Sequence, residues 1–274
     1  MAVATGRLPA NKRKQQQSGS LATRKRAIIS IASLVTLFIA YAIVSNSGRV
    51  NATLFPPPQA VVSAAIALFA EENLSIDILT SLGRVLTGYT IGVTLAILLG
   101  ALMGWFWLVD AVFDPIVELI RPVPPLAYIP LMILWFGIDE TPKIMVITLG
   151  CFVSCIINVV AGVKNTPLVY IEAARTMGAK SKDLFFTVAI PSALPYILTG
   201  MRVALGTAWA ILVAAELIAA QRGLGFMMTN ARRFIRTDSI IVGIICIGLL
   251  AFLMDRALRY VNIRLTCWME RREG

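Results

Sequence analysis

The sequence predicts an all-α integral membrane protein with about six transmembrane helices. Apolar residues fill 58% of its 274 positions, charged residues fill only 15%, and the mean hydropathy is +0.79. These values lie outside the usual range of globular proteins. A helix needs about 20 mostly apolar residues to cross the hydrocarbon core of a bilayer. Runs of that kind occupy residues 27–45, 84–105, 116–137, 142–163, 194–219 and 239–260.

The third of these runs is expected to be a broken span. Proline removes an amide hydrogen and clashes with the preceding helical turn, so several prolines cannot share one straight helix. Unwound backbone at membrane depth is tolerated only inside protein or beside a water-filled cavity. The prolines in or beside this run are Pro115, Pro122, Pro124, Pro125 and Pro130.

Basic residues are distributed unevenly between the two sides of the predicted spans. Seven lie in the tail at 1–26, four in the loop at 164–193 and five at the C-terminal end, which together are 16 of the 25. Cytoplasmic segments carry the excess of Lys and Arg. Both termini and the 164–193 loop are therefore expected in the cytoplasm.

Several functional classes are disfavoured by what the sequence lacks. It has no histidine, which is the commonest general base and metal ligand, and no phosphate-binding loop of the G-x-x-x-x-G-K-[ST] type. We expect no catalytic residue, no metal and no cofactor, with any ATP chemistry left to a partner. The net charge of +10 is attributed to topology and not to nucleic-acid binding. The four cysteines, Cys151, Cys155, Cys246 and Cys267, are interpreted as structural thiols.

The polar segment at 164–193 predicts a pair of short helices, at 167–177 and 182–189. Gly178 suits the left-handed residue that ends the first helix, and Pro191 is expected to end the second. Each helix is far too short to cross a bilayer. The residues alone support two interpretations equally, namely a surface gripped by another protein and a hairpin that lies on the membrane.

A family resemblance favours the first interpretation. Glu172-Ala173-Ala174, Gly178 and Ile190-Pro191 resemble the EAA signature of permease subunits of bacterial ABC importers. That signature implies a coupling helix that docks into a groove of the ATPase. The resemblance covers residues 54–268, and it is strongest to taurine permeases of the nitrate/sulfonate/taurine group at 54–62, 114–144, 190–206 and 212–227.

This resemblance implies a fold, a function and a set of partners. The fold is the type I ABC importer permease (MetI-like) fold with a cytoplasmic coupling-helix hairpin. The function is taurine import by alternating access across the bacterial inner membrane. The partners are a second copy of the chain, two ATPase subunits and an extracytoplasmic substrate-binding protein. Aliphatic-sulfonate or nitrate permeases remain alternatives, as does a secondary carrier or channel.

The predicted organisation has four parts. A cytoplasmic basic tail at 1–26 precedes the first transmembrane helix and an outer-side loop at 27–83, which includes a helix at 59–70. The permease core at 84–264 contains the coupling region at 164–193. A cytoplasmic tail follows at 265–274.

Charged residues inside the spans are candidates for the substrate pathway, because an unpaired charge in a membrane is costly. Asp114, Glu118 and Arg121 share a helix face and can neutralise one another, so Glu118 and Arg121 fit either a pathway or a structural salt bridge. Glu216 lies two turns from Trp209. It fits either a transient partner for the amine of a zwitterion or a carboxylate bonded to the backbone of the next loop.

The loop at 220–238 carries four arginines on the predicted outer side. We expect a short helix at 224–236 that places Arg232 and Arg236 on one face, where they either contact an acidic patch of the binding protein or raise the local concentration of the sulfonate. Arg233 departs from the related permeases, which often have an acid near this position, and is interpreted as a solvated residue.

Overall fold

The computed structural model describes residues 29, 32–33, 35–47 and 50–266, and within these ranges the chain forms helices and turns without any strand. The predicted all-α class is confirmed for these residues. The chain divides into two compact units, residues 1–62 and residues 63–274, which are described one at a time. The basic tail at 1–26, Cys267 and most of the tail at 265–274 lie outside the described residues.

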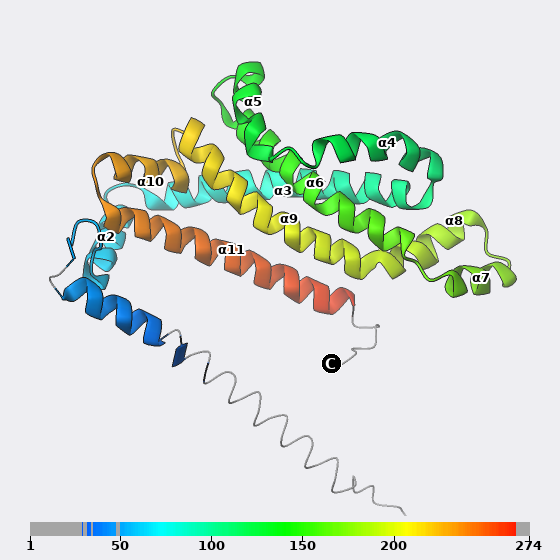
Figure 1. Ribbon diagram of the computed structural model, residues 1–274, viewed down its shortest axis with the longest axis horizontal. Helices are drawn as coiled ribbons and strands as arrows, with labels where there is room; N and C mark the ends of the chain where they lie inside the picture. Colours follow the sequence, from blue (N-terminus) through cyan, green and yellow to red (C-terminus); the bar gives the residue numbers. More distant parts are fainter. Residues whose placement is uncertain (1–28, 30–31, 34, 48–49, 267–274) are drawn as a thin grey trace, which may run out of the picture. The chain divides into compact units, whose positions relative to one another are not determined.

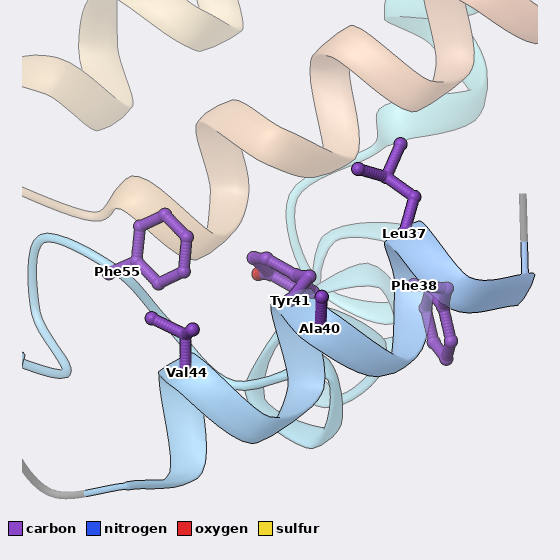
Figure 2. A pocket seen from close by; sticks show the side chains of 6 residues that line it. All are labelled: Leu37, Phe38, Ala40, Tyr41, Val44 and Phe55. Atoms are coloured by element: carbon purple, nitrogen blue, oxygen red, sulfur yellow. The ribbon is translucent and has the colours of Figure 1, made fainter. Parts of the chain in front are cut away.

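The main described element of the first unit is the helix Val35–Asn46. The Tyr41 hydroxyl donates a hydrogen bond to the Pro56 carbonyl oxygen at 2.5 Å, and the Tyr41 and Phe55 ring centroids are 5.1 Å apart. The predicted span at 27–45 begins outside the described residues, and its described helix is shorter than a span, so this crossing stays a prediction. Figure 2 shows the apolar groove on this helix, a cavity of about 650 Å³ lined by Leu37, Phe38, Ala40, Tyr41, Val44 and Phe55.

The next helix, α2 (Pro58–Ala70), contains the boundary between the two units and confirms the helix predicted at 59–70. Helix α3 (Leu74–Trp105) starts ten residues before the span predicted at 84–105. Asn73 adopts a left-handed conformation with φ 57°, and Asp77 lies in the first helical turn, where the helix dipole favours a negative charge. The boundary predicted at 83/84 therefore falls inside α3.

The second unit is built on four helices that are long and apolar enough to cross a membrane, together with one bent pair. The bent pair confirms the broken span: α4 and the following short helices meet at 84°, with the prolines Pro122 and Pro124 at the break. Five of the six predicted spans are thus present as apolar elements. Their bounds are α3 Leu74–Trp105, α4 Trp107–Ile120, η1 Pro125–Tyr128, α5 Ile129–Phe136, α6 Glu140–Lys164, α9 Ile190–Ala219 and α11 Thr237–Leu265.

Helices α3, α6 and α9 form the core of this unit, with α6 between the other two and α11 along the far side of α9 (Figure 1). Small residues explain how closely α3 and α6 approach. A Cβ atom added at four glycines of α3 would lie between 2.5 and 3.0 Å from atoms of α6. In a membrane, close backbone contact of this kind replaces the hydrophobic driving force between helices. The four are Gly88, Gly92, Gly100 and Gly104.

The segment at 164–193 folds as a hairpin at one end of the unit, here called the hairpin end (Figure 1). Its first helix is α7 (Leu168–Thr176), and Gly178 follows with φ 88°, as predicted for a left-handed C-terminal residue. The second helix does not end at Pro191. Instead α8 (Ser181–Asp183) continues through the π-helix η2 (Leu184–Ala189) directly into α9. Proline is tolerated in the first turn of a helix, and the wider π turns of η2 precede Pro191. The backbone hydrogen-bond pattern therefore changes at this point, but the helix continues.

At the opposite end, here called the loop end, α10 (Leu224–Arg233) follows the turn at 220–223. It is shorter than the helix predicted at 224–236. Ile235 has φ 55°, a left-handed conformation that a helix cannot continue through, and Arg236 precedes α11. Arg232 and Arg236 therefore do not share one helix face, and that part of the prediction is wrong.

Candidate functional site: buried charges and the hairpin

An arginine from α3 joins two carboxylates at the loop end. The Arg84 guanidinium contacts Glu140 through Nε at 2.5 Å and Nη2 at 2.7 Å, and its Nη1 lies 2.5 Å from Glu216 Oε1. Only 3% of the Arg84 side chain and none of the Glu216 side chain is exposed. Lys143, also buried, donates to Glu140 at 3.0 Å. The arrangement neutralises charges that would otherwise be costly to bury.

Glu216 also fixes the turn that follows its own helix. The amide of Gly225 donates to Glu216 Oε2 at 2.8 Å, and the Ser81 hydroxyl lies 2.8 and 3.0 Å from the two carboxylate oxygens. Ser81 in turn accepts a hydrogen bond from the Leu224 amide at 2.9 Å. This is the geometry of a carboxylate bonded to the next loop, one of the two roles expected for Glu216. A role in substrate passage stays a prediction.

The sequence interpretation missed the partner of Glu216. Arg84 is the first residue of the apolar run at 84–105, and Glu216 lies near the end of the run at 194–219. Their similar depth in the membrane could have indicated that the two residues pair, because charges embedded in a membrane usually pair. Beside the pair lies a polar cavity of about 270 Å³, lined by Thr80, Arg84, Ile138, Asp139, Glu140, Lys143, Gln221 and Arg222.

Trp209 lies in the core of the second unit, two turns before Glu216. Its side chain is 4% exposed, and its indole nitrogen is buried without a hydrogen-bond partner. Buried polar atoms are usually satisfied, so this donor is unusual. Trp209 therefore packs against the helices around α9, and contact with a substrate stays a prediction.

A second cavity, of about 240 Å³, lies toward the hairpin end between α3, α4 and α6, and its lining combines apolar side chains with four charged ones. Asp114, Glu118 and Arg121 all line it, as expected from their spacing on α4. No ion pair joins these three residues in the described part of the chain, so the expected mutual neutralisation is not seen. Asp110 and Lys164 instead form an ion pair of 2.7 Å beside them.

The hairpin presents an exposed face and a packed face. Glu172 and Ala173 of α7 are exposed, whereas Ala174, Ile190 and Pro191 are half-buried. Apolar residues of α7 are also exposed, with Leu168 and Val169 both at 70%. On the packed face, Phe185 of η2 lies 5.8 Å from Trp105 and 6.2 Å from Phe106 between ring centroids, which fixes the hairpin to the end of α3.

The arginines of the loop end differ in their contacts. Arg236 donates to Glu72 at 2.6 Å, and this hydrogen bond raises the pKa of Arg236 above its usual value. Arg232 and Arg233 are exposed, which agrees with a solvated Arg233.

Comparison with known proteins identifies the family. Residues 92–266 match the model of the family described as binding-protein-dependent transport system inner membrane component. The chain belongs to this family. Its members are membrane subunits of ABC transporters, so the chain is a permease and not an enzyme.

Relatives of this permease include transporters for sulfonates. A Brucella abortus (strain 2308) protein named as a probable ABC transporter permease is 45% identical over 81% of this chain and 88% of its own. The taurine transport system permease TauC of Escherichia coli (strain K12) is 41% identical over 89% of this chain and 90% of its own. SsuC of Bacillus subtilis (strain 168), named as an aliphatic-sulfonate transport permease, is 35% identical over 85% of this chain and 84% of its own. The predicted resemblance to the nitrate/sulfonate/taurine group is confirmed.

A solved structure supports the fold of the permease. An inward-facing structure of the MetNI methionine ABC transporter matches with a TM-score of 0.56 at 20% identity, over 69% of this chain and 95% of that chain. At this identity the match concerns the fold alone. It confirms the predicted type I importer permease fold.

Proposed function

We propose that this permease forms the membrane pathway of an ATP-driven importer for taurine. The observation that carries the proposal is the 41% identity to a taurine permease over 89% of the chain. The 35% identity to SsuC makes longer aliphatic sulfonates the alternative cargo. The cargo class is then a small sulfonate, with an added amine in the case of taurine.

The proposed assembly contains two copies of the permease, two ATPase subunits and one extracytoplasmic binding protein. The hairpin is the proposed ATPase contact, because Glu172 and Ala173 are exposed on a helix whose apolar residues Leu168 and Val169 are also uncovered. Exposed apolar groups of this kind mark contact surfaces. Ala174, Gly178, Ile190 and Pro191 complete the proposed coupling region.

The proposed orientation places the hairpin end and both termini in the cytoplasm. Support comes from the 16 basic residues on that side. The loop end then faces the binding protein, and exposed Arg232 is the better placed of the two proposed contacts. Arg236 already pairs with Glu72, so its proposed contribution requires that pair to be shared with the partner.

The pathway residues divide into two groups. Glu118 and Arg121 are proposed to contact the passing substrate, because they are charged side chains that line a cavity between α4 and α6. Trp209 and Glu216 are proposed to position the pathway wall and the turn at 220–225, because both are buried among protein groups. Alternating access is then a shift between two packings of the same helices, biased by ATP and by the binding protein.

Uptake by reconstituted vesicles tests the proposal. The permease is reconstituted with the ATPase and binding protein encoded beside it, and uptake of radiolabelled taurine is measured with ATP, without ATP and with competing hexanesulfonate or nitrate. We expect ATP-dependent taurine uptake that neither competitor reduces at tenfold excess. Uptake without ATP would indicate a carrier or channel, and preferential uptake of hexanesulfonate would indicate the alternative cargo.

A further inference from the structure

A second arginine–carboxylate pair lies away from Arg84 and Glu216, near the middle of α9 and α11. Arg202 of α9 and Asp255 of α11 face each other through two contacts, Nε to Oδ1 at 2.5 Å and Nη2 to Oδ2 at 3.0 Å. This is the paired geometry in which a guanidinium recognises an oxyanion. The side chains of Arg202 and Asp255 are 43% and 30% exposed, so another molecule can reach both of them.

The pair is located in the middle of its helices. Arg202 is 12 residues from the start of α9 and 17 from its end, which corresponds to about 18 and 25 Å at the α-helical rise. Asp255 is ten residues from the end of α11, or about 15 Å. Open charges at this depth are strongly disfavoured against lipid, and they typically face water, a substrate route or another polar group.

The surface of α9 beside this pair carries polar groups on both sides and a glycine between them. On the α6 side, the Ser154 and Thr207 hydroxyls are 3.2 Å apart. On the α11 side stands the Arg202–Asp255 pair. Between them Gly206 has no atom within 4 Å of the place where a side chain would begin. A small solute can therefore approach the helix backbone within one turn of the charges.

Asp255 has more capacity for a new cation than Glu216 has. Glu216 already receives bonds from Ser81, Arg84 and Gly225 and is 1% exposed. Asp255 contacts Arg202 and, at 4.0 Å, Arg259. The carboxylate of Asp255 can thus exchange the Arg202 guanidinium for an incoming cation without losing a hydrogen bond to the backbone.

We propose that Arg202 and Asp255 form a substrate site inside the membrane for an aminosulfonate. The sulfonate binds the Arg202 guanidinium, and the ammonium binds the Asp255 carboxylate. Because the zwitterion supplies both countercharges at once, neither side chain is left uncompensated when the pair opens. A sulfonate without the amine leaves Asp255 unpaired and binds more weakly. The inference rests on the proposed function, since it requires a cargo with both charges.

Direct binding to the solubilised permease–ATPase complex, without the binding protein, tests the site. Radiolabelled taurine and ethanesulfonate differ only in the amine. We expect wild type to prefer taurine at least tenfold. Asp255→Asn should weaken taurine binding at least tenfold and make ethanesulfonate bind as well as or better than in wild type, because no carboxylate is left unpaired, whereas Arg202→Gln should weaken both at least tenfold. The conservative Asp255→Glu should retain taurine binding within about threefold.

Two further variants separate the site from a structural latch between α9 and α11. The double variant Arg202→Gln/Asp255→Asn removes both charges of the pair together, so it should assemble normally and still bind neither ligand. Arg264→Gln removes a charge from the end of α11, where Arg264 contacts only Tyr260 among the described hydrogen bonds, and should bind both ligands as wild type. Unchanged taurine binding in the double variant would overturn the inference, and so would equal losses for both ligands in Asp255→Asn. Vesicle uptake by the wild-type protein reports separately on the proposed function. If the wild-type protein imports taurine but either overturning result is found in the variants, the substrate site is refuted and the proposed function is not.

Discussion

Arg84 Nη1 and Glu216 Oε1 lie 2.5 Å apart although 132 positions separate the two residues in the sequence. The contact joins the start of α3 to the end of α9, and Arg84 also donates to the carbonyl oxygen of Arg222 at 2.7 Å. One guanidinium thus connects two long helices and the turn between α9 and α10. Because both side chains are nearly inaccessible, the loss of Arg84 leaves the buried charge of Glu216 without its counterion.

Replacing Arg84 should therefore destabilise the permease strongly. Arg84→Met retains much of the volume but leaves the buried Glu216 without its cation, while Glu140 keeps Lys143, and we expect a loss of about 3–5 kcal/mol in the free energy of unfolding. Thermal unfolding of the detergent-solubilised protein measures the effect. The matched control is Arg236→Gln, which removes an exposed Arg–Glu pair and should cost about 0–1 kcal/mol. Equal losses in the two variants would refute the role assigned to burial.

Glu216→Gln tests whether Glu216 acts by holding the turn at 220–225. The amide keeps an acceptor for Ser81 and for Gly225 but loses the charge that pairs with Arg84. We expect uptake of taurine and of ethanesulfonate to fall by the same factor, because the turn and not the substrate loses a partner. A selective loss of taurine uptake would assign Glu216 to the amine instead.

Close packing around Glu216 predicts a contrast between two glycines. A Cβ atom at Gly225 would lie 2.6 Å from the Glu216 Cβ, whereas one at Gly248 of α11 would meet nothing within 4 Å. Gly225→Ala should lower the unfolding free energy by about 1–3 kcal/mol through overpacking. Gly248→Ala should raise it by about 0.5–1 kcal/mol through helix propensity. Thermal unfolding of both variants checks the sign of each change.

Local signals in the sequence were sufficient for the features that a few neighbouring residues determine. Clustered prolines predicted the break between α4 and η1, and Gly178 predicted the left-handed end of α7. Both depend on backbone rules that act within one or two turns. The composition of the runs at 84–105, 142–163, 194–219 and 239–260 predicted the four long helices in the same way, apart from the starts of α3 and α9, whereas the crossing at 27–45 stays a prediction.

Features that depend on distant residues were not predicted. The pairing of Arg84 with Glu216 needs the packing of α3 against α9, which no local pattern contains. The continuation of the helix through Pro191 depends on π turns whose side chains Leu184 and Phe185 are buried by tertiary contacts. The early end of α10 follows from the backbone of Ile235, a β-branched residue that rarely adopts positive φ.

The proposed orientation predicts which engineered cysteines react with membrane-impermeant reagents. In a chain without its own cysteines, Asp139→Cys should react from outside intact cells, because Asp139 is exposed at the start of α6. Ser181→Cys, exposed in the hairpin, should react only after the membrane is opened. Labelling of position 181 in intact cells would reverse the orientation.

The last prediction concerns the glycine between the two helices of the hairpin. Gly178 has φ 88° and open space around it, so an added methyl group meets no neighbour and acts only through the backbone. A side chain in this conformation costs about 1–2 kcal/mol. Gly178→Ala should relieve that strain by changing the angle at which α7 leaves the hairpin.

If α7 docks onto the ATPase, this change should weaken the complex by about 5–30-fold, the factor that corresponds to 1–2 kcal/mol. Binding of purified ATPase to the immobilised permease measures it. Gly137→Ala is the matched control, because Gly137 has φ 77°, is equally open and lies between α5 and α6. Its ψ of −175° is a conformation almost exclusive to glycine, so the variant should bear at least as large a backbone cost and still leave ATPase binding unchanged. Glu172→Lys, which reverses an exposed charge on α7 without bending it, should retain weak binding and uncouple ATP hydrolysis from taurine uptake. Wild-type ATPase binding and uptake in both Gly178→Ala and Glu172→Lys would show that the hairpin lies on the membrane and does not couple the two subunits.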